Sequence, residues 1–142
     1  MAWYPDLSAC DYFGEDAASS LTAVGWLERG RKFAKGNTDA QVYERLAELL
    51  QDPFQPMLLM GCQECDLCQF PGKHLGANNL FVPSDGTIYV CPELILHYID
   101  AHWYTPPEEF CQAVLSCPPT RSMEYKRLLL KNGAGVLLTK QD

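Results

Sequence analysis

The chain has 142 residues, of which 47% are hydrophobic, so it can bury a core without help from a metal or disulfides, and we expect one domain over residues 1–142. Eleven basic against 18 acidic residues give a net charge of −7, and no run of basic residues is present. This balance argues against a nucleic-acid or anionic-membrane partner, because such binding depends on clustered Lys and Arg.

The seven cysteines and the first residues bear on the cellular compartment. The start, Met-Ala-Trp-Tyr-Pro-Asp, lacks a basic region followed by an apolar one, and no apolar run approaches the roughly 20 residues that span a bilayer. We therefore expect a cytoplasmic protein whose cysteines are reduced thiols, some of them metal ligands, rather than a disulfide framework.

The first third of the chain predicts an irregular start, one strand and one helix. Residues 1–20 read as irregular segments that pack on the domain, and Leu21–Leu27 is apolar on both sides, as in a buried strand, although a helix beginning near Ala17 competes. The basic segment 29–36 is interpreted as a solvated connector. A helix capped by Asn37 or Thr38 should then run to about residue 50, because apolar residues recur at three- and four-residue spacing, at Val42, Leu46, Leu49 and Leu50.

The rest of the chain predicts a strand at 57–60, a hairpin and three helices. Two β-rich runs, 80–82 and 87–90, flank Asp85-Gly86, which is a strong hairpin signal. Helices are expected over 92–102, over 105–116 with Thr105 as a cap and Phe110, Val114 and Leu115 facing inward, and over 122–130 with Ser122 at the start. Residues 136–139 either add a strand or fray.

These elements predict an α+β fold: a small antiparallel sheet, a zinc-knuckle/hairpin/helix unit and about four packed helices. The metal-site unit occupies about residues 57–104. A helical C-terminal segment follows over about residues 105–133.

The spacing of cysteines and histidines predicts a metal site. Cys62, Cys65 and Cys68 form two overlapping Cys-x2-Cys pairs, and such a pair lets two thiolates reach one ion from a tight turn. His97-x4-His102 has the spacing of two imidazoles supplied by one helix. The first choice of ligands is therefore Cys65, Cys68, His97 and His102, with zinc as the metal.

The ligand set leaves alternatives open. His97 and His102 lie about 140° apart around an ideal helix, so joint ligation requires the last turn to distort. Without that distortion, Cys62, His74 or Cys91 replaces one of them. The order of knuckle, hairpin and helix resembles treble-clef zinc fingers, in which the position of Cys91 carries a helix-borne ligand.

Three classes of function fit such a site. The leading hypothesis is a non-enzymatic, zinc-stabilised module that binds a protein partner through its acidic surface or through Trp103, Tyr104 and Pro106, although these aromatic residues also fit simple packing. Cys-x2-Cys-x2-Cys with a distant Cys-Pro also resembles part of a ferredoxin ligand set, which would make an iron–sulfur redox or sensing protein. A metal-dependent hydrolase or nuclease is the third hypothesis, although no hydrolase motif is present.

Several segments resemble a family of small, uncharacterised bacterial proteins. They are Cys-Asp-Leu-Cys at 65–68, Asn-Leu-Phe-Val-Pro at 79–83, Tyr-Val-Cys-Pro-Glu-Leu-Ile-Leu-His-Tyr-Ile at 89–99 and Tyr-Thr-Pro-Pro-Glu-Glu-Phe at 104–110, with weaker likeness at 23–30 and 117–119. This resemblance implies a bacterial intracellular protein. It lends no mechanism, because no activity is attached to the family.

Overall fold

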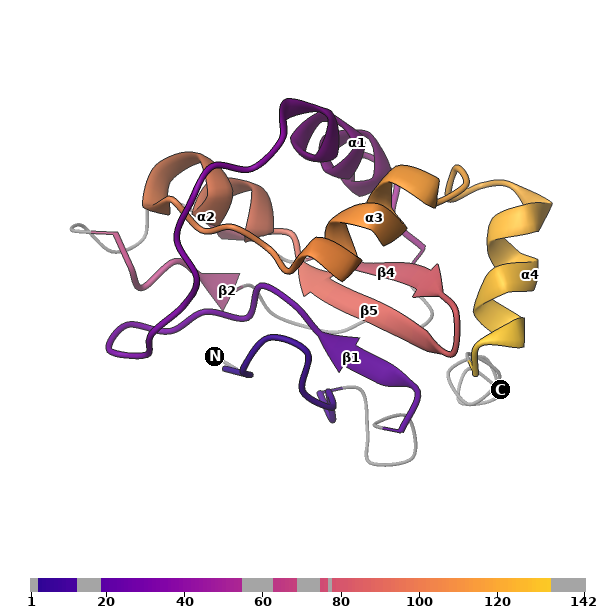
Figure 1. The fold of residues 1–142 in the computed structure, drawn as a ribbon, viewed down its shortest axis with the longest axis horizontal. Helices are drawn as coiled ribbons and strands as arrows, with labels where there is room; N and C mark the ends of the chain where they lie inside the picture. The colour runs from indigo at the N-terminus through magenta and orange to yellow at the C-terminus, as the bar shows by residue number, and fades with distance from the viewer. Residues whose placement is uncertain (1–2, 13–18, 55–62, 69–74, 77, 134–142) are drawn as a thin grey trace.

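The computed structural model describes residues 3–12, 19–54, 63–68, 75–76 and 78–133. Four helices and a small sheet confirm the α+β class (Figure 1). The strands expected at 57–60 and 136–139 lie outside the described residues, as do Cys62 and His74.

The main sheet has three strands in the order β1-β5-β4. β4 (Asn79–Ser84) and β5 (Thr87–Pro92) form the expected hairpin around Asp85-Gly86, where Gly86 has φ +80°, a conformation that a residue without a side chain adopts readily. β1 (Leu21–Ala23) runs parallel to β5, with Leu21 opposite Ile88. The sheet is therefore mixed, whereas the sequence predicted antiparallel pairing throughout.

A second sheet has two strands, one before and one after the turn at 65–68 that carries Cys65 and Cys68, which we call the cysteine turn. β2 (Gln63–Glu64) pairs antiparallel with β3 (Leu75–Gly76), and each strand is only two residues long. Such a short ladder contributes few hydrogen bonds, so the cysteine turn at 65–68 that follows β2 depends on other contacts.

The described residues form four helices: α1 (Ala40–Leu50), α2 (Ile95–His102), α3 (Glu108–Ser116) and α4 (Met123–Lys131). Figure 1 shows α1 and α3 on the same side of the hairpin, α2 close to β2, and α4 at the opposite end of the molecule. The predicted amphipathic face of α1 is buried, as the structure shows for Val42, Leu46, Leu49 and Leu50.

The helix starts differ from the sequence prediction in three places. α1 is capped by Asp39, whose carboxylate accepts a hydrogen bond from the Gln41 N–H at 2.8 Å, and not by Asn37 or Thr38. α2 begins at Ile95 and not at Pro92 as expected, because Pro92 is the last residue of β5. The N-cap position of α3 is Pro107, whose side chain makes no capping hydrogen bond, so Thr105 does not have the expected capping role.

Two predictions about the later helices have opposite outcomes. The expected cap of α4 is confirmed, since Ser122 Oγ accepts a hydrogen bond from the Tyr125 N–H at 3.1 Å. The inward orientation of Leu115 is wrong, because 42% of its surface is exposed, whereas Phe110 and Val114 are fully buried.

Candidate metal centre

The cysteine turn directly follows β2 and brings Cys65 and Cys68 to the same point. The backbone amides of Leu67 and Cys68 oppose the rise in the pKa of the Cys65 thiol, and amides beside a sulfur are expected of a metal knuckle. Cys65 is buried, and burial raises the pKa of its thiol to about 11. A metal ion at this position must therefore displace a proton from Cys65.

Arg29 holds the turn from the segment that follows β1. Its side chain donates from Nε to the Asp66 carbonyl at 2.6 Å and from Nη2 to the Cys68 carbonyl at 2.7 Å, while its backbone N–H donates to Asp66 Oδ1 at 3.1 Å. Two of these hydrogen bonds fix the backbone that carries both sulfurs, and the third holds the Asp66 side chain. The interpretation of segment 29–36 as a solvated connector missed this role, since a contact between residues 37 positions apart leaves no local pattern.

Both histidines belong to α2. His102 is the last helical residue, and Trp103 follows with φ 62° and ψ 19°, its backbone N–H bonding the Tyr98 carbonyl. Within the helix, His97 and His102 nevertheless bring their Nε2 atoms to 3.2 Å from each other. The expected obstacle to joint ligation is therefore absent, since the two imidazoles meet although both residues belong to α2.

Four donor atoms converge between the knuckle and α2. Cys68 Sγ lies 3.1 Å from His97 Nε2 and 3.5 Å from His102 Nε2, and Cys65 Sγ lies 3.4 Å from His102 Nε2. All four donors are within 4.8 Å of one another. A tetrahedral zinc ion with ordinary Zn–S and Zn–N bonds separates its donors by about 3.3–3.8 Å, so the group could hold one metal ion.

The remaining described cysteines do not belong to this group. Cys91 lies in β5 opposite Leu80 and is completely buried, and burial raises the pKa of its thiol. Cys10, Cys111 and Cys117 are also buried, with thiol pKa values raised mainly by burial. The role that the treble-clef resemblance suggested for Cys91 is therefore not supported. Cys62 and His74 lie outside the described residues.

The aromatic pair that follows α2 divides between packing and exposure. Tyr104 is fully buried and donates its hydroxyl hydrogen bond to Asp6 Oδ2 at 2.8 Å, which agrees with the packing interpretation. Trp103 is 66% exposed. Of this aromatic pair, Trp103 is therefore the member that lies on the surface, directly after the metal-ligand candidate His102.

Fold and site together define a small α+β protein with a group of two cysteines and two histidines that could bind a metal ion. The chain belongs to the family described as a domain of unknown function, DUF7919, whose model matches residues 2–115. The matched segment contains all four residues of the group and ends before α4. No curated protein and no solved structure matches the chain. Among the described residues, no helix is long and apolar enough to cross a membrane.

Proposed function

We propose that Cys65, Cys68, His97 and His102 bind one structural zinc ion, and that the protein is a non-enzymatic module for binding a protein partner in the cytoplasm. The observation that carries this proposal is the convergence of two sulfur and two nitrogen donors within 4.8 Å. Zinc favours tetrahedral sites built from these two donor types.

Charge supports zinc as the metal. Two thiolates balance the charge of a divalent ion, and the two imidazoles stay neutral, so the assembled site carries no net charge in a partly buried position. The compact donor group also favours one ion over an iron–sulfur cluster. A cluster places its protein ligands on different metal atoms, which requires a wider spacing of donors.

The number of ligands supports a structural role. Four protein donors complete a tetrahedron and leave no position for a catalytic water, whereas hydrolytic zinc sites keep one open. The local structure supports a stabilising role for an ion, since β2 and β3 have two residues each. A zinc ion that joins Cys65 and Cys68 to α2 would fix this part of the molecule.

Elemental analysis tests the metal assignment directly. Protein purified without a histidine tag or added metal should contain about one zinc per chain. Cys65→Ser should lose this zinc and, at free zinc a hundredfold above Kd, about 2.7 kcal/mol of stability. Because zinc must displace the Cys65 proton, affinity should also fall as the pH is lowered.

Cys111→Ser is the matched control, since Cys111 is buried away from the group and contacts the Pro106 carbonyl. This variant should retain the zinc of the unchanged protein. Equal metal content in the two serine variants would refute the ligand assignment, and iron with inorganic sulfide would move the protein to the redox class.

A further inference from the structure

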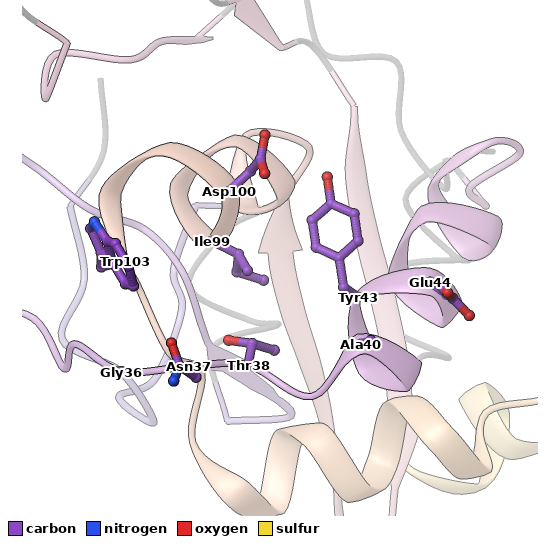
Figure 2. A pocket seen from close by; sticks show the side chains of 9 residues that line it. All are labelled: Gly36, Asn37, Thr38, Ala40, Tyr43, Glu44, Ile99, Asp100 and Trp103. Carbon is purple, nitrogen blue, oxygen red and sulfur yellow. The ribbon is translucent and has the colours of Figure 1, made fainter.

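A pocket of about 430 Å³ opens between the start of α1 and the end of α2. In Figure 2, Tyr43 of α1 and Trp103 stand on opposite sides of it, with Ile99 and Thr38 between them and Asp100 at its edge. The remaining lining residues are Gly36, Asn37, Ala40 and Glu44. Three lining residues, Ile99, Asp100 and Trp103, flank the metal-ligand candidate His102 in the sequence.

Trp103 breaks two local preferences at once. Its backbone has φ 62°, a conformation that is unusual for a bulky residue and that glycine or asparagine adopts more easily at a helix end. Its side chain is 66% exposed, although tryptophan is generally well buried. A residue that is both strained and exposed points to a role outside the fold of the chain itself.

The backbone on both sides of Trp103 is firmly held. The Gly36 N–H donates to the Trp103 carbonyl at 2.9 Å, the Thr105 N–H donates to the Ala34 carbonyl at 3.1 Å, and Thr38 Oγ1 donates to the Tyr104 carbonyl at 3.3 Å. The backbone that carries the indole ring is therefore held in one position. Such preorganisation lowers the entropy cost of binding.

The charged residues that line the pocket are both acidic. Asp100 and Glu44 line it, and neither takes part in the ion pairs formed within the described part of the chain. The overall charge of −7 adds to the attraction for a cation. Aromatic faces beside carboxylates favour a positively charged organic group through cation–π and ionic contacts.

We propose that this pocket binds an arginine side chain from a basic segment of a partner protein. A planar guanidinium stacks on Trp103 or Tyr43 and pairs with the Asp100 carboxylate through two hydrogen bonds. Most lining residues are exposed, so the pocket is open on one side, which suits a side chain entering from a larger partner better than an enclosed small molecule. This inference rests on the proposed function as an interaction module and specifies the chemistry of its partner.

A peptide titration followed by NMR tests the proposal. The probe is an acetylated and amidated peptide, Gly-Gly-Arg-Gly-Gly, and its reference is the same peptide with neutral citrulline in place of arginine. The zinc-loaded protein should show a shift of the Trp103 indole N–H with the arginine peptide at low salt. Binding of the citrulline peptide should be at least about fivefold weaker, the size of one cation–π or ionic contact.

Variants locate the contacts. Trp103→Asn removes the ring but suits the left-handed backbone, so it should keep zinc and stability while losing at least about fivefold in peptide affinity. Asp100→Asn should lose a similar factor. Glu124→Gln removes the same charge from an exposed position on α4, at the far end of the molecule in Figure 1, and should bind the arginine peptide as the unchanged protein does.

The outcomes separate this inference from the zinc proposal because the metal content is measured on the same samples. One zinc per chain with equal binding of the two peptides, or with full affinity in Trp103→Asn, overturns the arginine pocket and leaves the metal site standing. Selective arginine binding by protein that takes up no zinc supports the pocket and overturns the metal site. Tetramethylammonium binding as tightly as the arginine peptide would assign the pocket to a small free cation and refute a protein partner.

Discussion

Two regions of the molecule differ in the residues that lie at their centres. The core region, formed by β1, β4, β5, α1, α3 and α4, rests on apolar packing, with Ile88, Val90, Phe81 and Phe110 at most 1% exposed. The metal-centre region, formed by β2, β3, the turn at 65–68 and α2, has two-residue strands, and Cys68, His97 and His102 are only half-buried. Ile95 and Tyr98 of α2 also belong to the apolar core, so the donor groups of this region lie beside apolar packing and do not replace it.

Cysteine shows the same contrast. In the core region, Cys10, Cys91, Cys111 and Cys117 are small buried residues whose thiol pKa values are raised by burial. In the metal-centre region, Cys65 is also buried, but its sulfur lies 3.4 Å from His102 Nε2, and the backbone amides of Leu67 and Cys68 oppose the rise in its thiol pKa. One residue type therefore serves as a hydrophobic residue or a candidate ligand according to what surrounds its sulfur.

The largest effect is expected from a cavity in the core region. Ile88 is completely buried in β5, which pairs with both neighbouring strands, so Ile88→Ala should cost about 2–5 kcal/mol in the free energy of unfolding. Urea unfolding monitored by circular dichroism gives this value. Since Ile88 lies outside the metal-centre region, the loss should be equal with and without zinc.

Leu130→Ala is the control for this prediction. The residue is 53% exposed on α4, so its truncation should change stability by at most about 0.5 kcal/mol. A loss at Ile88 that depends strongly on zinc would show that the two regions do not behave separately.

A smaller effect is expected from the arginine that fixes the cysteine turn. Arg29→Ala removes the hydrogen bonds to the Asp66 and Cys68 carbonyls and should lower zinc affinity about 10–100-fold, as loss of groups that orient ligands does elsewhere. Competition with a chromophoric chelator measures the affinity. Arg31→Ala is the matched variant, because Arg31 pairs with Glu28 and lies over Trp3. Equal zinc affinity in the two variants would remove Arg29 from the metal centre.

Local sequence patterns predicted what depends on neighbouring residues. The hairpin followed from Asp85-Gly86, the start of α4 from Ser122, and the proximity of the four Cys and His residues from two short spacings. The hairpin and the helix start depend on residues within a few positions of one another. The metal-ligand group joins two segments 29 to 37 residues apart, and it was predictable because each segment carries a ligand-pair spacing of its own.

Long-range contacts escaped the same reasoning. The parallel pairing of β1 with β5 joins Leu21 to Ile88, and neither segment shows its partner's direction. Arg29 reaches the cysteine turn across 37 residues. Trp103 ends α2 in a conformation for which glycine or asparagine would have been the sequence signal. Tertiary contacts override local preference at each of these positions.

The smallest effect concerns Asp6, which joins the two regions. Asp6 Oδ1 accepts a hydrogen bond from the Gly25 N–H just beyond β1, and Oδ2 accepts one from the Tyr104 hydroxyl just beyond α2. Burial raises the pKa of Asp6 above its ordinary value of 3.8, although both hydrogen bonds oppose this shift. The folded protein therefore binds this proton more tightly than the unfolded chain does.

The resulting stabilisation is fully present below pH 3.8 and is lost as the pH rises through the pKa of Asp6 in the folded protein. From pH 3.8 up to the pKa of Asp6 in the folded protein, the unchanged protein should thus lose stability relative to Asp6→Asn. The loss should amount to at most about 1 kcal/mol, and the difference between the two proteins should stay constant at higher pH. Urea unfolding of both metal-free proteins at a series of pH values measures the difference without zinc release. A difference that changes in the opposite direction would mean that the two hydrogen bonds outweigh burial, and that Asp6 joins the regions as a stabilised carboxylate.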